Sequence, residues 1–198
     1  GGGLTNTMGK RFDVVIVGAA LNGLAAGLAM GGHRSRRPLS VAIVDAVDPY
    51  LKVSNAGDAR ASALTSSSKR MFEALGVWEH ISAYTQDMRE IIVTDGEPTL
   101  LQFGDVNTTQ TSTACMIENH VLLGGLLKTI EQSPHRTLIV GHAVTGQKFG
   151  PGLAVLTLAN GEDIPGNLIV AADGGKSPIR QAAGIEFVGW AYEQMGIV

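Results

Sequence analysis

The chain has 198 residues, of which 44% are hydrophobic and 17% are charged, and its formal net charge is −3 at pH 7. This composition can form a folded core and lacks the basic surplus of a nucleic-acid-binding protein, so we expect no nucleic-acid partner. The single cysteine, Cys115, excludes a disulfide within the chain and a cysteine-based zinc cluster. Such sparse use of cysteine is typical of a reducing compartment, and we expect a cytoplasmic location.

Residues 12–45 have the order of a nucleotide-binding strand–helix–strand unit. Gly18 lies where the chain must turn sharply off the first strand, and Gly23 lies where a side chain would keep the helix from packing on the sheet. Ala20 stands in place of the usual middle glycine, so one methyl group narrows the approach to a pyrophosphate. Glycine patterns also occur where helices simply pack tightly. The second strand and its terminal acid favour the nucleotide-binding interpretation.

The helix of this unit is predicted to begin at Leu21 and Asn22. Its first N–H groups and the positive end of its dipole are suited to phosphate groups. Asp45 ends the second strand, where a carboxylate would accept both hydroxyls of an adenosine ribose. An acid there repels a 2′-phosphate, which favours FAD or NAD over NADP as the resident nucleotide.

A compact basic loop at residues 33–38 separates the helix from the second strand. Two interpretations stay open for it, a solvated turn or electrostatic attachment to an acidic membrane surface. The second would place the protein peripherally on the inner membrane. A membrane span is not expected, because no window reaches about 18 uninterrupted apolar residues, and no apolar run precedes residue 14 as a signal peptide would require.

Residues 46–57 are predicted to be irregular, and residues 58–64 to lead into a helix. The buried face of that helix would carry Leu64, Met71, Phe72 and Leu75, and Gly76 would end it. Arg60 would stand just before the helix. Its guanidinium could reach a phosphate or a flavin edge, and a surface salt bridge is the alternative.

Short strands are predicted next, at residues 91–93 and 100–103, around a hairpin turn at 95–98. A third strand at 113–117 follows a threonine-rich loop. These strands interrupt the alternation of strand and helix, so we expect them to belong to an inserted layer.

The chain then returns to a helix at residues 118–132. Strands at 138–140, 143–149 and 153–158 follow in quick succession and resemble a β-meander that crosses one face of a nucleotide-binding sheet. A buried strand at 167–172 then delivers Asp173 and Gly174, followed by a helix begun by Ser177 and Pro178. This second turn is predicted to lie next to a phosphate.

These motifs together resemble the FAD-dependent aromatic monooxygenases of the para-hydroxybenzoate hydroxylase type. Residues 18–23 with Asp45 resemble the FAD fingerprint of that family, and residues 173–180 resemble its second motif, which touches FAD and the reduced nicotinamide. Residues 58–64 and 190–198 are more particular. They resemble the ubiquinone-biosynthesis ring hydroxylases of the 2-octaprenyl-6-methoxyphenol hydroxylase type.

The resemblance implies an α/β fold, a Rossmann-like FAD-binding βαβ domain with a β-meander and inserted strands of a substrate domain. It also implies that NADPH or NADH reduces FAD and that O2 is used to hydroxylate the ring of a polyprenylated phenol. A membrane surface, other biosynthetic enzymes and a second copy of the chain stay open as further partners. The residues expected to bind FAD are Gly18, Ala20, Leu21, Asn22, Gly23, Asp45, Arg60, Asn119, Val144, Asp173 and Gly174.

Two other functions stay open. One is another FAD or NAD oxidoreductase, such as a flavin-dependent ring reductase, which differs in that oxygen is not consumed into product. The other is a nucleotide-binding fragment without activity. No catalytic base is assigned, and the five histidines show no metal-ligand spacing, so no metal is expected.

The chain departs from the family at several places. Ala20 replaces a glycine, and Asn119 stands where related enzymes often carry an arginine that reaches the phosphate side of the flavin. The family's later Gly-Asp motif, the rest of its substrate sheet and its C-terminal helix are absent from this sequence. We therefore interpret the chain as the N-terminal half of an enzyme and expect it, by itself, to bind FAD weakly or not at all and to hydroxylate nothing.

Four segments are expected along the chain. Residues 8–86 and 118–184 would form the two segments of the FAD-binding domain. Residues 87–117 would be inserted strands of the substrate domain, and residues 185–198 would start the substrate sheet. An unpaired apolar edge strand at 187–198 would invite association with another chain.

Overall fold

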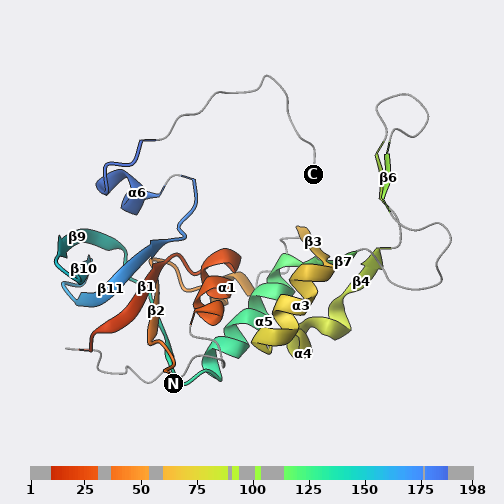
Figure 1. Ribbon diagram of the computed structural model, residues 1–198, viewed down its shortest axis with the longest axis horizontal. Coiled ribbons are helices and arrows are strands. Elements are labelled where there is room, and N and C mark those ends of the chain that lie inside the picture. Colours follow the sequence, from red (N-terminus) through yellow and green to blue (C-terminus); the bar gives the residue numbers. More distant parts are fainter. Residues whose placement is uncertain are drawn as a thin grey trace.

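The computed structural model describes residues 10–30, 37–53, 60–88, 91–93, 101–103, 114–175 and 177–186, with the backbone alone at 91–93 and 101–103. Its largest element is a six-stranded sheet with helices packed against it (Figure 1). The first four strands in spatial order run parallel and the last two run antiparallel, which confirms the expected α/β class. That order is β8 (Arg136–Val140), β2 (Val41–Asp45), β1 (Phe12–Val17), β11 (Asp163–Ala171), β10 (Leu153–Leu158) and β9 (Val144–Gly150).

The central strands β1 and β2 are buried on both faces over residues 14–17 and 41–44, which explains why these stretches are continuous apolar runs. On one face, Ile16 packs in a core that includes side chains of α1 (Leu21–Ala29) and α5 (Asn119–Glu131). On the opposite face, Val15 packs with buried side chains of β10. Helices therefore cover one side of the sheet and the antiparallel strands cover the other.

The carboxyl ends of three parallel strands meet at one edge of the sheet. Val17 at the end of β1 lies opposite Val44 of β2 on one side and Ala171 of β11 on the other. The N–H of Gly18 donates to the Val44 carbonyl at 2.8 Å, and the N–H of Ala172 donates to the Val17 carbonyl at 2.7 Å. From β1, the chain continues to β2 on one side of it, and β11 lies on its other side. In open α/β sheets, ligands bind at such a point, where the strand order reverses.

A smaller antiparallel sheet has the order β3–β7–β4. Residues 58–64 were predicted to lead into a helix with Leu64 on its buried face. A helix does follow, but the position of Leu64 is wrong, because residues 61–65 form β3 and pair with β7, so that Leu64 lies opposite Cys115. The helix α3 (Ser66–Leu75) starts afterwards and ends at Gly76, as expected, with φ of 76°. Of the predicted helix face, Phe72 is buried and Met71 is 42% exposed. The strands of this sheet are β3 (Ala61–Thr65), β7 (Ala114–Glu118) and β4 (Gln86–Met88).

The antiparallel strands that cover the second face are a meander of β9, β10 and the first half of β11. The predicted meander also included the strand at 138–140, which is wrong: that strand belongs to β8 and pairs in parallel with β2. Gly166 lets β11 change partners, since it lies opposite Ala154 of β10 and Phe12 of β1. A Cβ atom at Gly166 would lie 2.7 Å from Val15 Cγ2.

The remaining elements are short. Helix α2 (Tyr50–Val53) falls in a stretch that was predicted to be irregular, which is a correction. Strands β5 (Ile91–Val93) and β6 (Leu101–Phe103) pair antiparallel, which confirms the hairpin. Helix α6 (Pro178–Ala182) is capped as expected, because the Arg180 N–H donates to Ser177 Oγ at 3.0 Å. Two other short elements are α4 (Trp78–Ile81) and the 3-10 turn η1 (Ser82–Tyr84).

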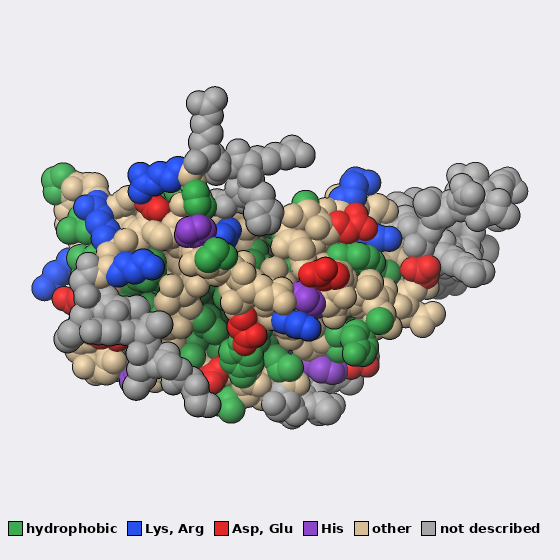
Figure 2. All heavy atoms as spheres, turned by 90° about the horizontal axis from the view of Figure 1, so that it is seen from below, with side chains coloured by type: hydrophobic (Ala, Val, Ile, Leu, Met, Phe, Trp, Pro, Cys, Tyr) green, Lys and Arg blue, Asp and Glu red, His purple; other side chains and the backbone are tan. Residues whose placement is uncertain are grey.

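Several predictions lie outside the described residues. They concern most of the basic loop at 33–38, the hairpin turn at 95–98 and the edge strand at 187–198 with its tryptophan motif. Within the described chain, each helix falls short of the length and apolar character that a membrane span needs. On the face drawn in Figure 2, acidic and basic side chains are interspersed with exposed hydrophobic ones.

Candidate functional site

Gly18 lies in the turn between β1 and α1, Gly23 lies in the first turn of α1, and neither position can hold a side chain. Gly18 has φ of +115°, and a Cβ atom there would lie 2.4 Å from the Ala172 carbonyl oxygen. A Cβ atom at Gly23 would lie 1.8 Å from the Gly18 carbonyl oxygen. The sharp turn and the close packing predicted from the sequence are therefore confirmed. The role of both glycines in cofactor binding stays a prediction.

Asp45 is held at the end of β2 by the turn itself. Its Oδ2 accepts the N–H of Ala19 at 2.7 Å, and its Oδ1 accepts the N–H of Val47 at 2.9 Å. A carboxylate offers about four acceptor positions, so two stay available to a ligand. The acid thus fixes the backbone of the turn and can still accept hydroxyl groups.

A cavity of about 480 Å³ opens over the carboxyl ends of β1, β2 and β11. This volume is in the range of small-molecule sites, about 300–1,000 Å³. The strand ends and the turns after them supply one wall, and the start of α6 supplies Pro178 and Ile179. The predicted site residues that line this cavity are Gly18, Ala20, Asn22, Asp45, Val144, Asp173 and Gly174.

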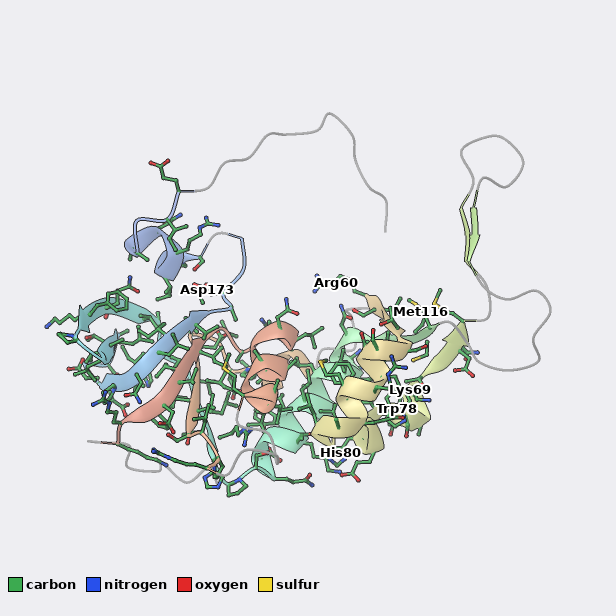
Figure 3. All side chains as sticks on the ribbon, in the orientation of Figure 1. Arg60, Lys69, Trp78, His80, Met116 and Asp173 are labelled. Carbon is green, nitrogen blue, oxygen red and sulfur yellow. The ribbon has the colours of Figure 1, made fainter. Side chains whose placement is uncertain are left out.

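Asp173 brings an unsatisfied acceptor to this cavity. Its Oδ1 is buried and has no hydrogen-bond partner among the described residues. Figure 3 shows Asp173 beyond the end of β11, on the side of α1 opposite to Arg60. A buried acceptor without a partner is costly, so this oxygen is suited to a hydroxyl group of a ligand.

A second cavity of about 340 Å³ lies on the other side of the α1 N-terminus. It shares Ala20, Asn22 and Lys52 with the first cavity. The predicted site residues Leu21, Arg60 and Asn119 also line it, together with His120 and Leu123. Among the predicted site residues, Gly23 lines neither cavity, because it packs against Gly18.

The pairing of β3 with β7 brings Arg60 and Asn119 together. The N–H of Asn119 donates to the Arg60 carbonyl at 2.9 Å, and Ser62 Oγ donates to Asn119 Oδ1 at 2.6 Å. The bond from Ser62 fixes the amide oxygen of Asn119, and the NH2 group is the part of the amide that can donate to a ligand. Arg60 therefore enters the site from the start of a strand, and not from the helix N-terminus predicted for it.

Sequence reasoning missed Lys52, the charged residue that lines both cavities. It lies on α2, a helix of four residues that is too short to produce a readable hydrophobic period. The one sequence feature that could have indicated Lys52 is its position shortly after Asp45, the acid that ends β2. Residues 173–180 were expected next to a phosphate, but Pro178 and Ile179 were not among the predicted site residues, since the cavity wall there forms only when β11 is paired with β1.

The charges of the two cavities differ. Asp45 and Asp173 line the first cavity, whereas the described lining of the second holds Lys52, Arg60 and His120 and no acid. No cluster of three metal-ligating side chains occurs in the described part of the chain. The arrangement therefore fits a dinucleotide, with hydroxyl-rich sugar at the acidic cavity and phosphate near the helix N-terminus.

Comparison with known proteins gives a family match. The family described as "FAD binding domain" matches residues 11–197. Ubiquinone hydroxylase UbiL from Rhodospirillum rubrum is 30% identical over 200 residues, which cover 100% of this chain and 45% of that protein. The 3-demethoxyubiquinol 3-hydroxylase of Escherichia coli is 30% identical over 186 residues, with coverage of 92% and 46%. The chain thus spans less than half the length of these curated relatives.

A solved structure supports the fold. The flavin-dependent monooxygenase PieE, in complex with FAD and substrate, matches with a TM-score of 0.67 and 20% sequence identity. The match covers 89% of this chain and 32% of PieE. At this identity the likeness concerns the architecture alone.

Proposed function

The chain belongs to the FAD-binding domain family, and from this premise we propose that it holds FAD for the hydroxylation of a phenolic ring. The proposed substrate is a polyprenylated phenol of ubiquinone biosynthesis, with NADH or NADPH as the reductant and O2 as the oxidant. The names of the two relatives support this substrate class. When bound, FAD would supply the redox chemistry, and the protein would supply binding and orientation.

One observation carries the proposal: Asp45 and Asp173 line one cavity at the point where β1 lies between β2 and β11. In our proposal Asp45 accepts the ribose hydroxyls of the adenosine end through its two open acceptor positions. The N–H groups at the start of α1 face the diphosphate. The unsatisfied Oδ1 of Asp173 accepts a hydroxyl from the middle of the cofactor.

The substrate class suggests where the protein works. A polyprenylated phenol is a membrane lipid, so we propose that the protein acts at the surface of the inner membrane. The basic loop at residues 33–38 is the sequence feature that supports this. Sedimentation with anionic and with neutral vesicles tests it, and equal recovery with both would contradict electrostatic attachment.

The central experiment is FAD binding by equilibrium dialysis, with Asp45→Asn as the test variant and Glu73→Gln as the matched control. Glu73 is an exposed acid on α3 and lines neither cavity. We expect Asp45→Asn to weaken binding of FAD and the control to leave it unchanged. Absence of FAD binding both by the unaltered chain and by the longest natural form of the protein would refute the proposal.

Hydroxylation is then assayed with the longest natural form of the protein. NADH or NADPH, a short-chain polyprenyl phenol and ¹⁸O2 are supplied, and mass spectrometry follows the label. Incorporation of one ¹⁸O atom into the ring supports a monooxygenase. Oxidation of the reduced nicotinamide with an altered but unlabelled product would instead favour a flavin-dependent reductase.

A further inference from the structure

Lys52 lies at the boundary of the two cavities. It lines both of them together with Ala20 and Asn22, at the N-terminus of α1. Of the described residues that the two cavities share, Lys52 is the charged one. An ammonium group is thus placed where the acidic cavity meets the basic one.

The helix that carries Lys52 is anchored to α5 by the residues on either side of it. The Tyr50 hydroxyl donates to a carboxylate oxygen of Glu131. Val53 Cγ1 lies 3.5 Å from the position that a Cβ atom would take at Gly124. Both contacts fix the backbone of α2, so Lys52 presents its side chain from a held position.

The Lys52 ammonium has no hydrogen bond or ion pair with another described residue. Asp48 Oδ1 accepts the N–H of Tyr50 at 3.0 Å and Glu131 accepts the Tyr50 hydroxyl, and neither of these acids is paired with Lys52. Lys52 is exposed. Its charge is therefore available to a ligand without breaking an existing contact.

We propose that Lys52 binds the diphosphate group of the dinucleotide. This inference rests on the proposed function and deepens it. A dinucleotide that extends from the Asp45 cavity past Ala20 carries its two phosphate charges at the shared boundary, where the α1 dipole and the Lys52 ammonium act together. Lysine serves such sites as a point charge, so arginine can replace it in part.

The test compares FAD, ADP and adenosine as ligands of the unaltered chain, Lys52→Met and Lys52→Arg. Lys148→Met is the control, because Lys148 is an exposed lysine of β9 and lines neither cavity. We expect Lys52→Met to weaken FAD and ADP about tenfold and to leave adenosine unchanged. Lys52→Arg should regain most of the affinity, and Lys148→Met should match the unaltered chain.

Salt gives an independent measure. Lys52→Met lacks the ion pair between the ammonium group and the phosphates of ADP. As the salt concentration rises, its affinity for ADP should therefore fall less steeply than that of the unaltered chain. Equal ADP affinity in Lys52→Met and the unaltered chain would overturn the inference, as would an equal loss for ADP and adenosine, which would indicate a structural role. If neither the unaltered chain nor the longest natural form of the protein bound any of the three ligands, the proposed function itself would fail.

Discussion

The carboxylate of Asp45 accepts the backbone N–H of Ala19 through Oδ2 at 2.7 Å. The acid at the end of β2 is thereby bonded to the turn that follows β1. Its other oxygen accepts the N–H of Val47. Asp45 therefore shapes the small-residue turn in addition to the sugar-binding role that we propose for it, and the two tasks can be separated by experiment.

Replacing Asp45 by alanine should affect both tasks. The N–H of buried Ala19 would lose its acceptor, so we expect the free energy of unfolding to fall by about 1–3 kcal/mol. FAD affinity should fall by roughly 1.5–3 kcal/mol for each ribose hydrogen bond that is lost. Urea denaturation and equilibrium dialysis measure the two losses separately. If FAD affinity did not change, Asp45 would have only the structural task.

Ala20 tests how closely a ligand approaches the turn. Its backbone is extended, with φ of −85° and ψ of −177°, and its side chain is exposed at both cavities, so larger residues should not disturb folding. We expect Ala20→Gly to bind FAD equally or more tightly and Ala20→Val to lose binding, with Tm nearly constant. Retained flavin absorbance in the valine variant would mean that the phosphates lie elsewhere.

Gly23→Ala should be strongly destabilising. The added methyl group would lie 1.8 Å from a backbone oxygen, which cannot move as a flexible side chain can. We expect a loss of about 3 kcal/mol or more in the free energy of unfolding. Gly146→Ala in β9 is the matched control, because its Cβ atom would lie 3.7 Å from Thr157. Equal stability of the two variants would contradict the close approach of α1 to the turn.

Arg136 donates hydrogen bonds to the C-terminal end of α1. From β8, its guanidinium donates to the carbonyl oxygens of Gly27 at 3.1 Å, Leu28 at 3.0 Å and Met30 at 2.8 Å, and burial lowers its pKa. Arg136→Ala should lower the free energy of unfolding by about 2–3 kcal/mol, and Arg136→Lys by less. Arg70→Ala, at an exposed position of α3, is the control. Hydrogen exchange should also become faster at the C-terminal turn of α1.

Asp13 gives a pH-dependent prediction. The backbone N–H and the hydroxyl of Ser40 donate to its Oδ2 at 2.9 and 3.1 Å, and these bonds, with Arg37 nearby, hold the pKa of Asp13 below its usual value. A lowered pKa means that the stabilisation is complete above the unfolded value, near pH 4, and is lost as the pH falls through the folded value. Asp13→Asn should therefore be less stable than the unaltered chain at pH 7, with the difference shrinking toward pH 2. A constant difference would contradict this.

The sequence by itself determined the nucleotide-binding unit. Its strands contain continuous apolar runs at 14–17 and 41–44, and Gly18, Gly23 and Asp45 stand at fixed distances from them, so local pattern is enough to place the turn. The same holds for Ser177 and Pro178, whose capping of α6 depends on neighbours in the chain. The cofactor-binding roles of these residues and the four-segment division of the chain stay predictions.

Only the tertiary structure decided which distant segments meet. No local pattern in residues 61–65 distinguishes a strand from the approach to a helix. They form β3 because β7, some fifty residues later in the chain, supplies their hydrogen-bond partners. In the same way β8 joins the parallel sheet through β2, and α2 brings Lys52 to both cavities through its anchors on α5. Strand pairing and helix packing are stabilised by partners far along the chain, so no window of sequence contains the information that fixes them.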